Sequence, residues 1–192
     1  MTPRIRVLVL ALCGLLGGCA RPQQLNAVLP STPLVGTDGI AHALYGRAES
    51  ARLTVLVYFA DHCPCQAAHD ARLLELAHRY HDRGVDVFAI DPEVGASLER
   101  DGEEARRRGY PFPILVDQGA LLARRLGAEY ATESFVVDRA GVVRYHGGID
   151  SDRKVLHEDA RPYLRDAIDD LLEGRAPRVA EAKTLGCALQ LW

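Results

Sequence analysis

The residues best suited to chemistry are three cysteines: Cys63, Cys65 and Cys187. Cys63 follows an apolar run, residues 53–59, and precedes a stretch with helical periodicity. A cysteine at the start of a helix lies beside unpaired N–H groups and the positive end of the helix dipole, and both stabilise a thiolate. Pro64 suits the first helical position, because the N–H that proline lacks would be unpaired there. We therefore interpret Cys63 as a nucleophilic thiol rather than an inert buried cysteine.

Two further thiols are available to resolve a mixed disulfide or sulfenic acid formed on Cys63. Cys65 is two positions further along the expected helix, so its side chain points about 200° around the axis from that of Cys63. A bond between them requires the first turn to unwind, which would leave the bond strained. Cys187 follows Gly186 near the end of the chain, where it either reaches Cys63 or packs beside Leu189. Both interpretations of Cys187 stay open.

The same segment also offers metal ligands. Cys65 and His69 are four positions apart and share one face of the expected helix, while His62 and Cys63 stand at its start. Thiolate and imidazole together suit Cu(I) or zinc. We therefore retain a copper-binding alternative that uses Cys63, Cys65, His62 and His69, although the first expectation is a protein without a cofactor. The other place for His69 is the polar face of the helix.

The composition favours one globular domain and argues against a nucleic-acid partner. The chain has 192 residues, of which 48% are hydrophobic and 26% charged, and its formal net charge is −3. These values suit a folded domain with a proper core. No basic stripe of the kind that binds a phosphate backbone stands out.

Residues 1–18 have the pattern of a signal peptide. Arg4 and Arg6 precede an apolar stretch, residues 7–16, which is too short to span a bilayer as a helix. Small residues follow at positions 17 and 18, as expected before a cleavage site. The sequence therefore predicts an exported protein.

The segment Leu-Gly-Gly-Cys at residues 16–19 resembles the lipobox of bacterial lipoproteins, in which cleavage precedes a cysteine that is then acylated. The resemblance implies a lipid on Cys19 and attachment to the cell envelope, facing the periplasm. Ala20, in place of Asp, would permit transfer to the outer membrane. The alternative is an ordinary secretory signal in which Cys19 is incidental. Three cysteines follow this segment, and an odd number in an oxidising compartment suits redox chemistry better than structural disulfides.

The rest of the chain divides into a tether (residues 19–33), a domain (34–175) and a tail (176–192) that carries Cys187. Within the domain, apolar runs and helical periodicity alternate, and a Thr-Asp-Gly turn precedes them. The pattern predicts strands at 53–59, 85–90, 114–117, 134–138 and 142–145, and helices at 66–82, 96–108, 120–126 and 159–173. This order indicates an α/β fold with a central mixed sheet flanked by helices on both faces.

The order of elements and the position of Cys63 resemble the thioredoxin fold, and more narrowly the redoxin branch grouped with AhpC/TSA-type proteins. Several landmarks agree in order with that branch, and the last three are similar to a bacterial subgroup with a C-terminal Gly-Cys. The matching segments are Tyr58–Cys63, Tyr110–Asp117, Leu126–Ala128, Phe135–Gly141, Tyr145–Asp150, Leu171–Gly174 and Thr184–Cys187.

The resemblance implies a membrane-anchored thiol–disulfide oxidoreductase with Cys63 as its nucleophile, and it admits thiol-peroxidase or antioxidant activity. The implied partners are protein thiols or disulfides, a small thiol, or a peroxide. The alternative from a different class is a thioredoxin-fold copper-binding chaperone. A third, a redox-inactive adaptor, leaves the three thiols unexplained.

Several positions depart from the related patterns. Gln66 stands where thioredoxins have their second cysteine, and Val57 replaces their buried acid. Thr132 occupies the place of the proline that faces the nucleophile, so we expect a trans peptide bond there. Glu133 beside it is expected to be a solvated surface residue, with a proton acceptor as the alternative.

Two more departures concern peroxide chemistry. Peroxiredoxins carry a threonine and a proline that polarise and position the peroxide, and the matching positions here are Ala60 and Leu56. Without those groups, the sequence predicts slow or auxiliary peroxide reduction rather than a fast peroxidase.

Overall fold

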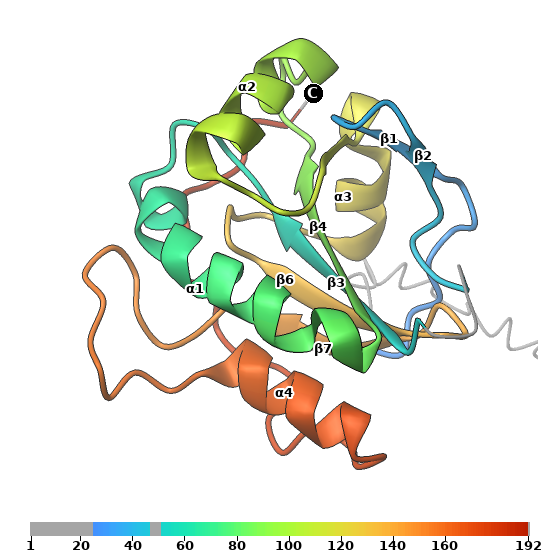
Figure 1. Cartoon of the computed structure of the whole chain (residues 1–192), viewed down its shortest axis with the longest axis vertical. Coiled ribbons are helices and arrows are strands. Elements are labelled where there is room, and N and C mark those ends of the chain that lie inside the picture. Colours follow the sequence, from blue (N-terminus) through green and yellow to red (C-terminus); the bar gives the residue numbers. More distant parts are fainter. Residues whose placement is uncertain (1–24, 47–50, 192) are drawn as a thin grey trace, which may run out of the picture.

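The computed structural model describes residues 25–46 and 51–191. Those residues form a seven-stranded sheet with helices on both faces (Figure 1). The strands are β1 (Leu34–Gly36), β2 (Ala41–His42), β3 (Leu53–Tyr58), β4 (Val85–Asp91), β5 (Ile114–Val116), β6 (Ser134–Asp138) and β7 (Val143–Gly147). The α-helices are α1 (Pro64–Tyr80), α2 (Leu98–Arg108), α3 (Leu121–Leu126) and α4 (Tyr163–Leu172), with short 3₁₀ turns η1 (His81–Arg83) and η2 (Gln118–Ala120).

The sheet has the strand order β2-β1-β5-β4-β3-β6-β7. Strands β3, β4 and β5 are parallel to one another, while β6 runs antiparallel to β3 and β7 antiparallel to β6. β1 and β2 form an antiparallel hairpin around the Thr-Asp-Gly turn, and β1 also pairs antiparallel with β5. The predicted α/β fold with a mixed, thioredoxin-like sheet is confirmed.

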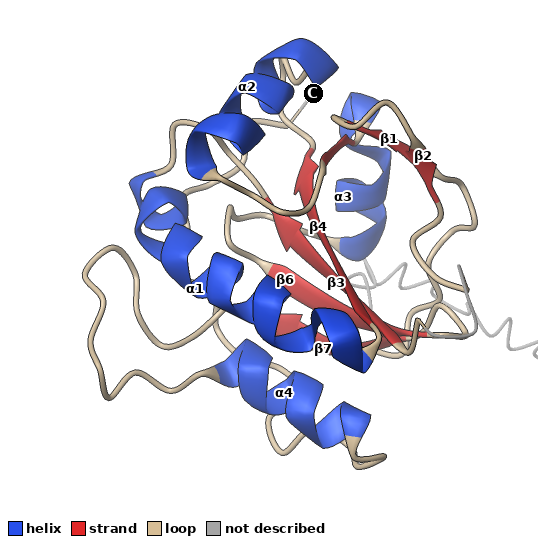
Figure 2. Ribbon diagram, in the orientation of Figure 1, coloured by secondary structure: helices blue, strands red, loops and turns tan. Residues whose placement is uncertain are grey.

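The apolar run before Cys63 becomes the central strand β3, in which all six residues are buried. Its side chains alternate between two core clusters, one on each face of the sheet. Val55 and Val57 point to the face covered by α1 and α4, whereas Leu56 and Tyr58 point to the face covered by α3 (Figure 2). The strand that delivers Cys63 is therefore held on both sides.

Local sequence signals set the helix limits. Ser97 caps α2, since its Oγ accepts a hydrogen bond from Arg100 N at 3.2 Å. Gly109 ends the same helix in the left-handed conformation, with φ 68°, which glycine adopts without strain. The last helix begins at Tyr163 rather than at residue 159, because Pro162 stands at its N-cap with non-helical angles (φ −86°, ψ 66°).

Part of the segment 19–33, for which a tether was predicted, is hydrogen-bonded to the sheet. Asn26 N donates to Val143 O, and Leu29 N donates to Gly141 O, both at 2.9 Å. The predicted signal peptide and Cys19 lie outside the described residues. Of the helices within the described ranges, none combines the length and apolar character needed to cross a membrane.

The C-terminal tail crosses the sheet at the C-terminal end of β3. It forms isolated bridges at three points: Glu181 with His146, Ala188 with Tyr130, and Leu191 with Glu93. Because the chain continues from this end of β3 to Cys63, the tail passes directly over the predicted nucleophile.

Candidate functional site

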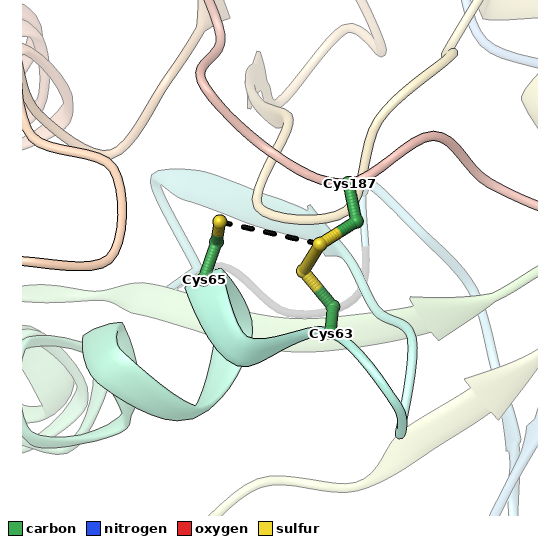
Figure 3. A group of neighbouring side chains, drawn as sticks. All are labelled: Cys63, Cys65 and Cys187. Carbon is green, nitrogen blue, oxygen red and sulfur yellow. Dashed lines mark hydrogen bonds between the residues drawn. A yellow bond between two sulfur atoms is a disulfide. The ribbon is translucent and has the colours of Figure 1, made fainter.

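The structure joins Cys63 to Cys187 by a disulfide across 124 residues of sequence (Figure 3). Their Cα atoms lie 5.8 Å apart, within the usual range for a disulfide. The Cys63 side chain is buried, with 1% of its surface exposed, whereas Cys187 is partly exposed. Of the two candidate partners predicted for Cys63, the one on the distant tail is therefore the one bonded.

Cys63 is the N-cap residue of α1, with extended angles (φ −83°, ψ 115°), and Pro64 occupies the first helical position as predicted. No side chain caps this helix start, and the first turn holds no acidic residue. The positive end of a 17-residue helix is therefore not neutralised by a carboxylate of its own first turn, and it stabilises negative charge on the Cys63 sulfur once the disulfide opens.

Cys65 remains a free thiol and is buried, with 1% of its surface exposed. Its Sγ lies 4.0 Å from that of Cys187 and donates a weak hydrogen bond toward it. The three sulfurs all lie within 4.8 Å of one another. Ala60 and Ala131 pack around them in a small apolar cluster.

Thr132 lies in the loop before β6, is buried, and directly follows Ala131, which packs against Cys63 and Cys65. Its peptide bond is trans, as predicted, and the described residues contain no cis peptide. The φ angle of Thr132 is +69°, a left-handed conformation that costs a β-branched residue free energy. A hydrogen bond from Thr132 N to Tyr58 O, at 2.8 Å, ties the loop to the end of β3.

Glu133 is a correction to the sequence analysis: it is buried, with 3% of its surface exposed, and not solvated. One carboxylate oxygen lies 2.5 Å from His146 Nε2. The other accepts hydrogen bonds from the N–H groups of Glu129 and Tyr130, at 2.8 and 3.0 Å. Glu133 therefore holds the loop against which the tail is placed.

The tail is hydrogen-bonded to this loop on either side of Ala188. Ala131 N donates to Cys187 O at 2.8 Å, and Leu189 N donates to Glu129 O at 2.9 Å. A Cβ atom at position 186 would collide with the carbonyl oxygen of Ala131, so the approach requires Gly186. The Gly-Cys pair seen in the sequence has this physical basis.

Gln66, at the position of the second thioredoxin cysteine, is fully buried. Its amide donates to the Tyr110 hydroxyl at 3.1 Å, and that hydroxyl donates to Asp70 at 2.5 Å. Asp70 also pairs with Arg108 at 2.8 Å. The hydrogen bonds of Gln66 and Asp70 therefore attach α1 to the end of α2.

His69 is also corrected, since it is buried rather than on a polar helix face. Its Nδ1 lies 2.8 Å from Cys65 O, and its Nε2 lies 3.1 Å from Asp150. Burial opposes protonation, but the hydrogen bonds to Asp150 and to the Cys65 carbonyl outweigh it and raise the pKa of His69. Because both partners accept hydrogen bonds, His69 is satisfied as an imidazolium that donates twice.

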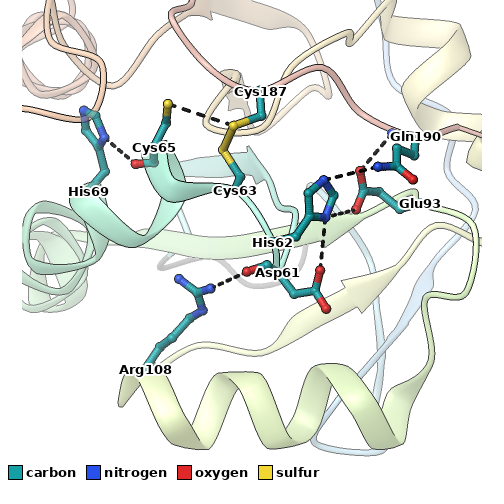
Figure 4. Close-up of a disulfide and its surroundings, with 9 residues drawn as sticks. All are labelled: Asp61, His62, Cys63, Cys65, His69, Glu93, Arg108, Cys187 and Gln190. Carbon is teal, nitrogen blue, oxygen red and sulfur yellow. Dashed lines mark hydrogen bonds and ion pairs between the residues drawn. A yellow bond between two sulfur atoms is a disulfide. The ribbon is translucent and has the colours of Figure 1, made fainter.

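His62 lies on the other side of the sulfurs and is largely exposed (Figure 4). Its Nδ1 is 3.2 Å from Asp61 and 3.4 Å from Glu93. The set Cys63, Cys65, His62 and His69 is therefore not assembled as one cluster. In the described part of the chain, Cys63 and Cys65 form one group of candidate ligands with Cys187. His62 forms a separate group with the carboxylates of Asp61 and Glu93.

These features define a class: a thioredoxin-like domain with a cysteine disulfide at the start of its first helix. The family profile described as Redoxin matches residues 24–161, and the chain belongs to this family. A comparison with curated proteins found no match.

Solved structures share the fold of this chain. A hypothetical protein from Sinorhizobium meliloti 1021 is 25% identical, with a TM-score of 0.79 over 88% of this chain and 94% of that chain. An uncharacterized conserved protein from Geobacillus kaustophilus is 28% identical, with a TM-score of 0.78 over 88% and 92%. A peroxidoxin from Mycobacterium tuberculosis, 17% identical, shares the fold, with a TM-score of 0.55 over 63% and 82%. Family and site together support a redox function.

Proposed function

We propose that the protein is a thiol–disulfide oxidoreductase in which Cys63 is the nucleophile and Cys187 the resolving thiol. The observation that carries this proposal is the disulfide between them, which joins a helix N-cap to a tail 124 residues away. An apolar packing role for Cys187 would not require that bond. The Redoxin family membership supports the same conclusion.

The reaction proceeds by two thiol–disulfide exchanges. In the reduced protein, the Cys63 thiolate attacks one sulfur of a substrate disulfide, forms a mixed disulfide and expels the other substrate sulfur as a thiolate. The Cys187 thiolate then attacks the Cys63 sulfur, and the second substrate sulfur leaves. The substrate gains two electrons, and the protein keeps the Cys63–Cys187 disulfide.

An external thiol donor restores the reduced protein by attacking Cys187. This sulfur is the partly exposed one, whereas Cys63 is buried beneath the tail. Attack on Cys187 expels Cys63 as a thiolate at the positive end of α1, which makes Cys63 the better leaving group. A second donor thiol then attacks the donor sulfur of the mixed disulfide, which leaves the donor oxidised and frees Cys187.

Peroxide reduction is an auxiliary activity in this proposal. The Cys63 thiolate would attack one peroxide oxygen, break the O–O bond, expel the other oxygen as hydroxide or alkoxide, and become a sulfenic acid. Cys187 would condense with the sulfenic acid, releasing water and forming the same disulfide. Ala60 is buried near the cysteines and carries no hydroxyl with which to polarise the peroxide. We therefore expect the disulfide reaction to be the faster one.

We also propose that the protein is exported and lipid-anchored through Cys19 to the periplasmic face of the envelope, as the sequence pattern suggests. The domain geometry is compatible with this arrangement. Residues 26–29 bind at the end of the sheet where β3 begins, and Cys63 follows the opposite end of β3. Residues 19–25 span at most about 25 Å, which would hold the disulfide on the side away from the membrane.

The test is catalysis of insulin disulfide reduction with dithiothreitol as donor, using the whole chain with Cys13→Ser and Cys19→Ser as background. The chain with these two substitutions should accelerate insulin reduction above the rate with dithiothreitol alone. Adding Cys63→Ser should return the rate to that of dithiothreitol alone. Cys65→Ser is the matched control and should retain turnover. Undiminished turnover in the Cys63→Ser variant would contradict the proposal.

A further inference from the structure

Cys65 takes no part in the exchange reactions, yet it is buried beside the two cysteines that do. Its sulfur lies 4.0 Å from Cys187 Sγ, and all three sulfurs lie within 4.8 Å of one another (Figure 3). Buried free thiols are common, but three thiols from two separate segments that converge on one point need a reason.

One reason would be an internal relay, in which Cys65 attacks the Cys63–Cys187 disulfide. Such a displacement requires the attacking, central and leaving sulfurs to lie near one line. Here the Cys65 sulfur is 4.0 Å from Cys187 and within 4.8 Å of Cys63, so the three sulfurs form a compact triangle. The arrangement does not suit in-line attack at either sulfur.

The triangle does suit a metal ion bound at its centre. Metal–thiolate bonds are about 2.3 Å long, so three thiolates around one ion in a plane lie about 4.0 Å apart. The Cys65–Cys187 separation already has this value. Reduction of the disulfide moves the Cys63 and Cys187 sulfurs from a bonded to a non-bonded separation. The distance between these two sulfurs thereby increases toward the same length.

The surroundings of the sulfurs select a soft ion. Ala60, Ala131 and Leu189 pack around the cysteines and limit access of water. Among the described residues, no carboxylate or imidazole belongs to this group of ligand atoms. His69, the nearest candidate by sequence, directs one ring nitrogen to a backbone carbonyl and the other to Asp150 (Figure 4). An all-sulfur, three-ligand set favours Cu(I), whereas structural zinc sites have four ligands.

We propose that the reduced protein binds one Cu(I) ion through the thiolates of Cys63, Cys65 and Cys187. Three thiols release their protons to solvent on binding, and the ion keeps its oxidation state. The positive end of α1 offsets part of the negative charge of the complex. Because Cys63 and Cys187 supply sulfur to both the metal site and the disulfide, the two states exclude each other.

The experiment titrates the whole chain, reduced and free of oxygen, with Cu(I) in competition with a chromophoric Cu(I) chelator. Cys13→Ser and Cys19→Ser form the background, so that only the three cysteines of the domain remain. We expect one Cu(I) per chain and at least a tenfold loss of affinity in Cys65→Ser. His62→Gln is the matched control and should bind as tightly as the background chain.

X-ray absorption of the copper-loaded chain identifies the ligands directly. Three sulfur neighbours at one distance support the proposal, while two sulfurs or any nitrogen neighbour would overturn it. Equal Cu(I) affinity with and without Cys65 would also overturn it. The outcome is separate from that of the oxidoreductase test, because Cys65→Ser is expected to lose copper affinity and keep disulfide turnover.

Discussion

The amide of Ala131 donates a hydrogen bond to the carbonyl oxygen of Cys187, at 2.8 Å. This bond attaches the backbone of the tail to the loop that faces the start of α1, one residue away from the left-handed Thr132. The tail therefore positions Cys187 by its backbone as well as by the disulfide. After reduction the same contact keeps the two thiols close, which raises their effective concentration.

Replacing Gly186 by alanine should make the Cys63–Cys187 disulfide easier to reduce. The new Cβ would collide with the Ala131 carbonyl, so the tail must move away before it can pack. We expect the equilibrium constant for disulfide formation to fall about tenfold, equivalent to about 30 mV. Titration in a thiol–disulfide buffer measures it. Gly102→Ala, within α2, is the control, and an unchanged constant in Gly186→Ala would show that the tail tolerates the displacement.

A monothiol donor should attach to Cys187 when it opens the disulfide. Oxidised Cys65→Ser protein, treated briefly with glutathione and then alkylated, should carry glutathione on Cys187 and the alkyl group on Cys63. The reason is that Cys187 is the partly exposed sulfur and Cys63 the better leaving group. Peptide mass spectrometry locates both groups, and glutathione found on Cys63 would reverse the assigned order of attack.

Introducing at position 132 the proline that thioredoxins have there should destabilise the domain rather than produce a thioredoxin-like loop. Proline fixes φ near −65° and has no N–H, whereas Thr132 has φ +69° and donates to Tyr58 O. We expect Thr132→Pro to lower the free energy of unfolding by about 3 kcal/mol. Thr132→Gly, which tolerates the left-handed conformation, should stay within about 1 kcal/mol of the native protein. Urea denaturation compares them, and equal stability of the two variants would contradict this argument.

Loss of Glu133 should be far more costly than loss of its exposed neighbour Glu129. Glu133→Ala leaves two loop N–H groups and buried His146 without their carboxylate. We expect a loss of about 3 kcal/mol in the free energy of unfolding, and less than about 0.5 kcal/mol for Glu129→Ala. Chemical denaturation measures both values. Similar small losses would mean that water replaces the carboxylate at no cost.

The buried pair of His69 and Asp150 should make stability depend on pH. The pKa of His69 is raised from 6.5, so its contribution is complete below 6.5 and is lost as the pH rises through the folded value. Burial acts to raise the pKa of Asp150, but hydrogen bonds from His69, Asp152 N and Arg72 outweigh it and hold that pKa below 3.8. Its contribution is therefore present above 3.8 and lost at lower pH.

The pair is expected to contribute most between about pH 4 and 6.5. Asp150→Asn should lower the free energy of unfolding by about 3 kcal/mol in that range, and the difference should shrink toward pH 9. Unfolding measured across pH provides the comparison. A difference that stays constant from pH 5 to 9 would show that His69 does not carry the charge.

Local patterns were enough to predict the elements that position the site. The apolar run before Cys63 is buried on both faces, and Pro64 opens the helix, because both signals act within a few residues. The partners of Glu133 and His69 were missed, since His146 lies in β7 and Asp150 in the loop after it, and periodicity does not reveal pairs between distant segments. The choice between Cys65 and Cys187 depended on the path of the tail, a contact across 124 residues.

The tail also covers part of β7, one of the two edge strands of the sheet. His146 N donates to Ala180 O, and Ala182 N donates to His146 O, both at 3.0 Å, so residues 180–182 occupy the outer side of β7. An uncovered edge strand is a template on which a second copy of a chain can pair and aggregate. These hydrogen bonds do not involve sulfur, so opening the disulfide leaves the edge covered. We therefore expect reduction of the disulfide to leave the β7 edge unavailable for pairing with a second copy of the chain.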